Sequence, residues 1–481
     1  MSDVLWHGSE VIAALDKHLI APPHSDWHAH GLAIDTRELN RDDIFVALPG
    51  ERTHGHDHVA RAFEEGAVAA LVGADFNADD NADAGVLLRV DNVLAALEAL
   101  ARAARSRSQA HIIAITGSVG KTGTKASLAA ALMKSGTVHA AERSFNNHIG
   151  VPLTLARLPE DAEFGVFELG MNHAGEIAAL VDMVRPHCAI ITTIAAAHIE
   201  NFDSMASLAA AKAEILGGIE KGGTAILPFD NEYFDMLAAK TKDHKINILS
   251  FSAEGRSDAD SHIERAKLHE TCSCVSANIC AQAVTYKIGA PGIHLVANSL
   301  AILTAVNVAG ADLALAALSL ATQDGLAGRG ARYRLGGDDA TVTLIDESYN
   351  ANPTSMAAAL DTLSLSPRKG QGRRIAVLGD MAELGDGAAQ LHGDLADKAD
   401  AADIDLVITC GALMKNLHDA LPTGRLGMHA DNHHEALLIL RRELHRDDVV
   451  MVKGSNASRM GLVVDGLIDM LTETQQQKGV L

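Results

Sequence analysis

Residues 116–122, TGSVGKT, combine residue types and a spacing that suit phosphate chemistry. Glycines let the backbone approach phosphate oxygens, and the N–H groups of the loop and of a following helix would face the anion. Lys121 can reach the β- and γ-phosphates, and the Thr122 hydroxyl suits Mg²⁺. The usual P-loop has a glycine where this chain has Ile115, so this is the shorter T-G-x-x-G-K-T form. The predicted nucleotide-binding residues are Gly117, Ser118, Val119, Gly120, Lys121 and Thr122.

Three further residues could take part in metal chemistry. Magnesium needs oxygen ligands beyond a threonine, and Glu168 at the end of a strand signal is a candidate, the alternative being a solvated glutamate. His198 alone is more typical of a helix cap or a core histidine, and Lys212 alone of a surface lysine. A lysine with a lowered pKa can also add CO₂ to give a carbamate, which is an oxygen ligand.

The pattern around the loop predicts the elements that position these side chains. The apolar run Ile112–Ile115 is typical of a buried strand, and Leu128, Ala131 and Leu132 lie on one side of the helix expected after the loop. Ligands of open α/β sheets bind beyond the carboxyl ends of the strands, so polar residues there should gather near the loop. Further strands are expected at 164–169, 188–194, 224–227 and 246–251, followed by a hairpin excursion at 258–290.

The length of 481 residues exceeds one ordinary core, so we predict an α/β protein with three domains. Residues 1–108 predict a small α/β domain, 109–330 a central P-loop domain with a mostly parallel sheet, and 331–481 a second doubly wound, Rossmann-like unit. In the third block, polar clusters follow strand signals at 346–353, 378–385 and 452–460. Such clusters facing the nucleotide domain are what a two-substrate enzyme would place across a cleft.

Composition excludes several classes of protein. The formal charge of −22 argues against a nucleic-acid binder, which needs a basic face, although it leaves anionic small molecules open. No apolar run approaches the ~18 residues of a membrane span, and the N-terminus lacks the features of a signal peptide. We therefore expect a cytoplasmic protein. Five cysteines without a fourth clustered ligand predict structural thiols rather than a zinc site.

Several motifs along nearly the whole chain resemble those of the Mur ligases, the ATP-dependent amino-acid-adding enzymes of peptidoglycan synthesis. They are TGSVGKT, SFNNHIGVPLTL, ELGMNHAGEI, AAAHIENF, AKAEI, DESYNANP, GDMAELG and KGSNASRM, in the order of the family. ELGMNHAGEI, SYNANP and GDMAELG are most similar to the member that adds D-alanyl-D-alanine to UDP-N-acetylmuramoyl-tripeptide. The resemblance implies that ATP activates the terminal carboxylate of the tripeptide as an acyl phosphate, which the dipeptide amine attacks.

The resemblance also implies roles for residues. The catalytic set would be Lys121, Glu168, His198 and Lys212. Two Mg²⁺ ions would be held by Thr122, Glu168, His198 and a carbamylated Lys212. Further ATP contacts would come from Asn298, Arg329 and Asp346. Substrates would be bound by Thr36, Arg37, Asn146, Asn147, Tyr349, Asn350, Asn352, Lys453 and Arg459, with Thr36 and Arg37 in a UDP-binding N-terminal domain.

The sequence departs from the family pattern at one position, and three other functions remain as alternatives. The family often has His-Asn before the adenine-side helix, whereas here His294 is followed by Leu295. The alternatives are a sibling ligase that adds the third residue, a folylpolyglutamate synthase, and a nucleotide-binding scaffold without turnover. A monomer is expected.

Overall fold

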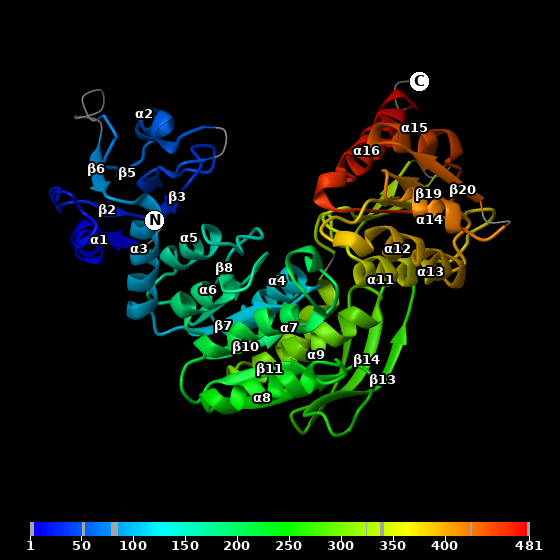
Figure 1. The fold of residues 1–481 in the computed structure, drawn as a ribbon, viewed down its shortest axis with the longest axis horizontal. Coiled ribbons are helices and arrows are strands. Elements are labelled where there is room, and N and C mark those ends of the chain that lie inside the picture. The colour runs from blue at the N-terminus through cyan, green and yellow to red at the C-terminus, as the bar shows by residue number, and fades with distance from the viewer. Residues whose placement is uncertain are drawn as a thin grey trace.

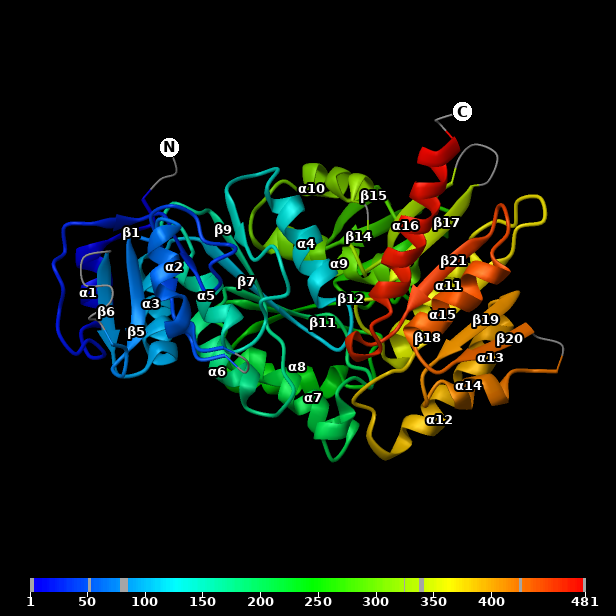
Figure 2. The same ribbon diagram turned by 90° about the horizontal axis from the view of Figure 1, so that it is seen from above.

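The computed structural model describes residues 4–50, 53–77, 85–323, 325–336, 341–423 and 426–478. Three sheets that are wholly or mostly parallel follow one another along the chain, with the first and third above opposite ends of the second (Figure 1). Seen from above, the chain runs from the N-terminal sheet at one end to the C-terminal sheet at the other (Figure 2). The fold class predicted from the sequence is confirmed.

The first sheet has the order β3-β4-β5-β6 and is entirely parallel. Its strands are β3 (Gly31–Ala33), β4 (Asp43–Val46), β5 (Ala69–Gly73) and β6 (Val86–Val90). A short antiparallel pair, β1 (Trp6–His7) with β2 (His28–Ala29), lies beside it. The helices are α1 (Gly8–Leu15), α2 (Val59–Glu64) and α3 (Val93–Arg107).

The second sheet has the order β15-β14-β13-β12-β11-β10-β7-β9-β8. Its parallel strands are β7 (His111–Thr116), β8 (Val138–Ala140), β9 (Phe164–Glu168), β10 (Cys188–Ile191), β11 (Thr224–Pro228), β12 (Asn247–Ser252) and β13 (Ser261–Leu268). The predicted hairpin excursion is β13 with β14 (Ser273–Ile279) and β15 (Gln282–Ile288), paired antiparallel. Its helices are α4 (Lys121–Leu132), α5 (Gly150–Ala156), α6 (Glu176–Val184), α7 (Met205–Ala213), α8 (Phe234–His244), α9 (Ile293–Val308) and α10 (Leu313–Ser319).

The third sheet has the order β16-β17-β21-β18-β19-β20. Its strands are β16 (Ala331–Leu335), β17 (Val342–Glu347), β18 (Arg374–Gly379), β19 (Leu406–Cys410), β20 (Leu426–Ala430) and β21 (Val449–Lys453). Its helices are α11 (Pro353–Ser364), α12 (Ala388–Gly393), α13 (Leu395–Ala401), α14 (Lys415–Ala420), α15 (His433–Glu443) and α16 (Gly461–Lys478). For the third block the sequence pattern predicts no strand before 341 and a single helix at 388–401; the structure instead has an antiparallel edge strand, β16, and two helices in that range.

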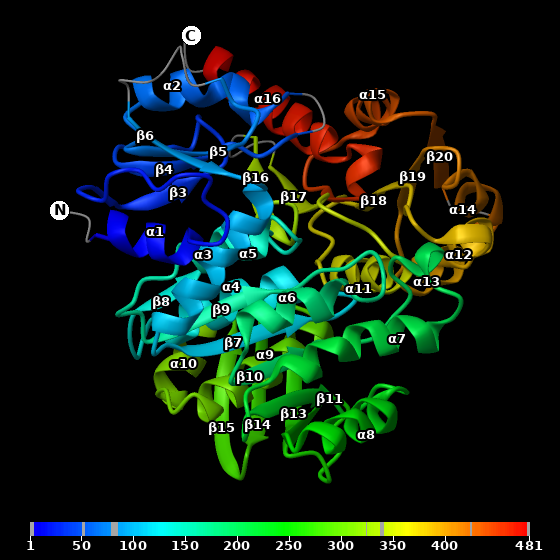
Figure 3. The ribbon, with the colours of Figure 1, turned by 60° about the vertical axis from the view of Figure 1, so that its left-hand side comes forward.

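One hydrophobic cluster joins the first sheet to one face of the second. It runs from Trp6 and Leu32 through Leu100 of α3 to Leu237 of α8. The indole Nε1 of Trp6 donates a hydrogen bond of 2.9 Å to the carbonyl of Ala156, which is 150 residues away in sequence. Figure 3 shows α3 and α5 lying between the two sheets. The opposite face of the second sheet has its own cluster beneath α4 and α9.

Among the described residues, no helix combines the length and the apolar character that crossing a bilayer requires.

Candidate active site

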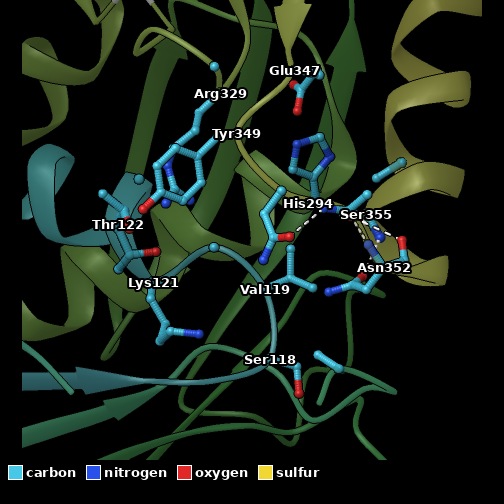
Figure 4. Close-up of a pocket in the computed structure, with 18 of the residues that line it drawn as sticks. Ser118, Val119, Lys121, Thr122, His294, Arg329, Glu347, Tyr349, Asn352 and Ser355 are labelled. Atoms are coloured by element: carbon cyan, nitrogen blue, oxygen red, sulfur yellow. Dashed lines mark hydrogen bonds between the residues drawn. The ribbon is translucent and has the colours of Figure 1, made fainter. Parts of the chain in front are cut away.

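A cavity of about 790 Å³ lies between the second and third sheets. The glycine loop after β7 and Glu168 at the end of β9 line it from one side. Glu347 at the end of β17 and Lys453 at the end of β21 line it from the other. The carboxyl edges of two parallel sheets therefore face one space, which is where α/β folds bind ligands. Figure 4 shows side chains from both sides pointing into it.

The glycine loop has a backbone that only glycine tolerates at two positions. Gly117 has φ 146° and Gly120 has φ 87°, and both lie in the region that side chains disfavour. A Cβ at Gly117 would lie 2.0 Å from the Thr192 hydroxyl, and one at Gly120 would lie 2.8 Å from Nδ2 of Asn298. Helix α4 begins directly at Lys121, so its free N–H groups point to the cavity. This is the cradle that the sequence predicted.

Lys121 lies folded against its own loop. Its Nζ donates a hydrogen bond of 2.7 Å to the carbonyl of Gly117. Burial lowers the pKa of Lys121, while the carboxylate of Glu168 acts in the opposite direction. The ammonium group is therefore held at the loop, on the wall of the cavity that an entering phosphate would reach.

Oxygen atoms converge beside the lysine. The Thr122 hydroxyl lies 3.0 Å from Oε1 of Glu168 and 3.1 Å from the Ser144 hydroxyl. The amide of Asn146 donates to the same Oε1 at 2.8 Å. The other carboxylate oxygen, Oε2, is buried and has no hydrogen-bond partner among the described residues. A buried carboxylate oxygen left over beside a hydroxyl matches the hard oxygen ligands of Mg²⁺, so these residues fit that ion.

His198 lines the cavity, whereas Lys212 is buried near His198 and Lys121 and is not among the lining residues. The Nδ1 atom of His198 is in hydrogen-bond contact with the carboxylate of Glu383. Burial lowers the pKa of His198, and Glu383 acts in the opposite direction. Lys212, on α7, is only 1% exposed, and burial together with the charge of Lys121 lowers its pKa well below the ordinary value. Its Nζ donates no hydrogen bond to any residue in the described part of the chain, so a neutral amine suits this position.

The residues outside the glycine loop that were expected to contact ATP fall into two groups. Asn298 and Arg329 line the cavity. The Arg329 guanidinium lies 3.8 Å from the centre of the Tyr349 ring and donates to the Ser144 hydroxyl at 3.3 Å. Asp346 does not line the cavity. Its carboxylate accepts hydrogen bonds from the Gly328 amide at 2.6 Å and from the Ser348 hydroxyl at 2.6 Å. These bonds hold the chain crossing, the segment 325–330 where the chain passes from the second sheet to the third.

The predicted substrate residues are likewise divided. Those that line the cavity are Asn146, Tyr349, Asn350, Asn352 and Lys453. Asn147 precedes α5, and its Oδ1 accepts a hydrogen bond of 2.9 Å from the Gly150 amide. Arg459 is exposed beyond the lining residues. Thr36 and Arg37 follow β3 in the first sheet, away from this cavity, and Arg37 pairs with Asp35 at 2.5 Å.

Sequence reasoning missed four residues of this region. Glu347, Ser144 and Lys125 surround the predicted set, and Glu383 contacts it from the third sheet. Glu347 had a signal, since it stands at a strand end two residues before Tyr349. Glu383 lies in the polar cluster at 378–385 that was expected to face the nucleotide domain, but nothing in the sequence pointed to its pairing with His198, which lies 185 residues earlier.

A second cluster of possible metal donors lies in the first sheet. His54, His56 and Asp75 have donor atoms within 4.8 Å of one another. The Nε2 atom of His56, however, accepts a hydrogen bond of 3.0 Å from the Gly73 amide. The neutral ring therefore carries its proton on Nδ1, which leaves His56 no free lone pair for a cation.

Comparisons with known proteins agree across the chain. Family models match in three places: "Mur ligase family, catalytic domain" at 28–105, "Mur ligase middle domain" at 115–306, and "Mur ligase, glutamate ligase domain" at 331–456.

Curated relatives with the name UDP-N-acetylmuramoyl-tripeptide–D-alanyl-D-alanine ligase align with nearly the whole chain, and two of them serve as examples. The Escherichia coli protein is 35% identical over 92% of this chain and 94% of its own length. The Rickettsia prowazekii protein is 31% identical over 96% of this chain and 99% of its own.

Solved structures agree. MurF from Acinetobacter baumannii superimposes with a TM-score of 0.83 at 26% identity, covering 96% of this chain and 99% of its own. MurF from Thermotoga maritima, solved in complex with ADP, shares the fold with a TM-score of 0.77 at 24% identity, covering 92% and 98%.

Proposed function

The chain belongs to the Mur ligase family, and we propose that its cavity joins D-alanyl-D-alanine to UDP-N-acetylmuramoyl-tripeptide, with ATP as the phosphoryl donor. The observation that carries this is the convergence of the glycine loop with the strand ends of the third sheet on one space. Full-length relatives named for this reaction set it apart from sibling ligases and from folylpolyglutamate synthases. A scaffold without turnover is disfavoured because Lys121, Glu168, His198 and Lys212 are all present.

The reaction needs activation because a carboxylate is a poor acyl donor at neutral pH. The γ-phosphoryl group of ATP passes to the terminal carboxylate of the tripeptide, giving an acyl phosphate and ADP. The free amine of D-alanyl-D-alanine then attacks the carbonyl carbon, and the tetrahedral species collapses with loss of phosphate and a proton. Negative charge builds on phosphoryl oxygens, where Lys121 and the loop N–H groups supply electrostatic stabilisation.

We propose Thr122 and Glu168 as ligands of one Mg²⁺ and His198 with Lys212 as the organisers of a second. The support is the unpartnered Oε2 of Glu168 and the buried, uncompensated amine of Lys212. A neutral amine can add CO₂ and lose a proton, which converts Lys212 into a carbamate with two oxygen donors. When bound, Mg²⁺ would neutralise charge on the transferring phosphoryl group.

Each sheet has a proposed task. The block 1–108 is proposed to hold the UDP part of the substrate through Thr36 and Arg37. The block 109–330 is proposed to bind ATP, with Asn298 and Arg329 arranged around it, while Asp346 of the third block holds the adjoining segment 325–330 in place. The block 331–481 is proposed to present the acceptor through Tyr349, Asn350, Asn352, Lys453 and Arg459, with Asn146 and Asn147 near the reacting carboxylate. We further propose that the enzyme is a cytoplasmic monomer.

An assay of ADP release tests the reaction. The purified enzyme should release ADP with UDP-N-acetylmuramoyl-tripeptide and D-alanyl-D-alanine together, and far less when either is omitted. Tripeptides that end in diaminopimelate and in lysine should be compared as substrates. ADP release that depends on a single amino acid instead of the dipeptide would reject the assignment.

A further inference from the structure

The second and third sheets touch at a place separate from the chain crossing at 325–330. The Glu200 amide donates a hydrogen bond of 3.2 Å to the Glu383 carbonyl. Between them, Ile199 packs against the hydrophobic cluster of the third sheet that contains Met381 and Leu384, and also against the cluster of the second sheet. We call this contact, between residues 198–200 and 383–385, the loop contact.

A side-chain pair completes the loop contact. Nδ1 of His198 meets Oε2 of Glu383. An ionised carboxylate can only accept hydrogen bonds, so Nδ1 carries the proton and donates it. In the neutral imidazole the lone pair then lies on Nε2. His198 lines the cavity that Lys121 and Glu168 also line, and Nε2 is the ring nitrogen that the Glu383 contact leaves without a proton.

The backbone at both residues is unusual. His198 has φ 59° and Glu383 has φ 61°, in the left-handed region that residues other than glycine and asparagine rarely adopt. Such conformations persist where the surrounding structure determines them, and they gather at functional sites. Two such residues, from different sheets, meet side chain to side chain. The backbone hydrogen bond at Glu383 and the packed Ile199 hold both in register.

Metal-binding histidines generally donate their second ring N–H to a carboxylate, which fixes the orientation of the ring. We infer that Glu383 is the positioning residue for His198, so that docking of the third sheet on the second turns the Nε2 atom of His198 toward the cation that accompanies ATP. The inference rests on the proposed function and assigns to the GDMAELG segment a task in it. Glu383 also lines the cavity, and the role inferred for it is exerted through the His198 ring.

The consequence is a link between domain docking and the nucleotide site. Glu383 comes from the third sheet, so the His198 ring loses its hydrogen-bond acceptor whenever that sheet moves away. The cation environment is then complete only when the domain that presents the acceptor has closed. This would favour phosphoryl transfer after the acceptor domain is in place.

The test uses the full-length enzyme with Mn²⁺ and ADP and without peptide substrates. Electron paramagnetic resonance measures Mn²⁺ affinity, and its nitrogen hyperfine coupling reports a histidine ligand. Glu383→Ala should weaken Mn²⁺ binding about 10- to 100-fold and remove the nitrogen coupling. Glu383→Gln keeps an acceptor oxygen at the same place and should restore most of both. Asp386→Ala is the matched control, because Asp386 is an exposed acid in the same loop with no side-chain partner among the described residues.

Two results would overturn the inference. One is a Glu383→Ala enzyme that retains wild-type Mn²⁺ affinity and nitrogen coupling. The other is a wild-type complex without nitrogen coupling, since His198 then does not contact the ion. Glu383 is 45% exposed on its side chain, so its replacement should leave the melting temperature near that of the wild type. Because no peptide is present, either result would leave the ADP-release assignment standing.

Discussion

The ammonium nitrogen of Lys453 lies 3.3 Å from Oε2 of Glu347, its register partner on the neighbouring strand. The same nitrogen donates to the carbonyl of Asn350 at 3.0 Å. Lys453 is nearly fully buried, and Glu347 is 23% exposed. The pair therefore ties the ends of β17 and β21 together at the cavity wall, beneath the Tyr349–Asn352 segment.

Lys453→Met should destabilise the third sheet. It removes two hydrogen bonds and leaves a half-buried carboxylate without its cation, for which we expect a loss of about 1–3 kcal/mol in the free energy of unfolding. Urea unfolding followed by circular dichroism measures it. In the double variant with Glu347→Gln, part of this loss should be recovered, because the unpaired charge is gone. Strictly additive effects would contradict a direct pair.

Glu168→Gln should remove metal-dependent activity while the fold stays intact. The amide offers one oxygen where the carboxylate offers two, and it withdraws the charge that attracts the cation. We expect kcat to fall by about 100-fold or more and the Mg²⁺ concentration for half-maximal rate to rise. Glu160→Gln, at an exposed position whose side chain has no hydrogen bond among the described residues, should behave as the wild type. Activity of the Glu168→Gln enzyme within a few-fold of the wild type would rule out Glu168 as a ligand.

Lys212→Ala should abolish activity, and a short carboxylic acid such as formate or acetate should partly restore it. The alanine variant leaves space at a buried position where the acid can supply the oxygens of the proposed carbamate. The measurement is ADP release against acid concentration. Lys221→Ala, an exposed lysine beyond the same helix, should not respond to the acid. Full activity of Lys212→Ala without added acid would end the carbamate proposal.

Lys125→Met should disturb the loop that carries Ser144 and Asn146. Lys125 is 2% exposed, and its Nζ donates to the carbonyls of Ala141 at 2.5 Å and Arg143 at 2.7 Å. Without these bonds, residues 141–147 should exchange amide hydrogen faster and kcat should fall by about 10-fold or more. Lys134→Met, at an exposed position just beyond the end of the same helix, is the control. Unchanged hydrogen exchange in the loop would contradict this role.

His111 should make stability depend on pH. Burial and the neighbouring His187 lower its pKa to about 4, from an ordinary value near 6.5. The unfolded chain then binds more protons between those values, so stability is full above pH 6.5 and is lost as pH falls toward 4. After discounting for partial exposure, we expect this residue to contribute about 2 kcal/mol to the loss.

His111→Gln should flatten that slope in urea unfolding measured at pH 5 and pH 7. His262→Gln is the control, because the His262 ring is only partly buried and lies in the hairpin. Its slope of stability against pH is compared with that of His111→Gln. An identical pH dependence in the wild type and in His111→Gln would exclude the assignment.

Short sequence patterns predicted the elements whose structure depends on neighbouring residues in the chain, and they missed those that depend on distant pairing. The glycine loop could be predicted because its backbone has positive φ at Gly117 and Gly120. A sequence that forms this loop therefore needs glycine at both positions. Strand β16 was missed because Ala331–Leu335 carries two arginines and a tyrosine and becomes a strand by pairing with β17. The helix expected at 388–401 breaks at Gly393-Asp394, a pair with poor helix propensity.

The candidate site divides in the same way. Thr122 and Glu168 could be predicted because each stands at the end of a strand or loop in the same sheet. Lys212 looks like a surface lysine in its alanine-rich helix, and only the packing of α7 buries it. Asp346 stands at a strand end as the cavity residues do, but the amide of Gly328 and the hydroxyl of Ser348 occupy its carboxylate.

The hydrophobic cluster that runs from Trp6 to Leu237 has a practical consequence. Heating or denaturant should melt the first two sheets in one cooperative transition, while the third can melt by itself. A protease would then release a stable N-terminal fragment ending near 325–330, and expression of residues 1–108 alone would yield an aggregating polypeptide.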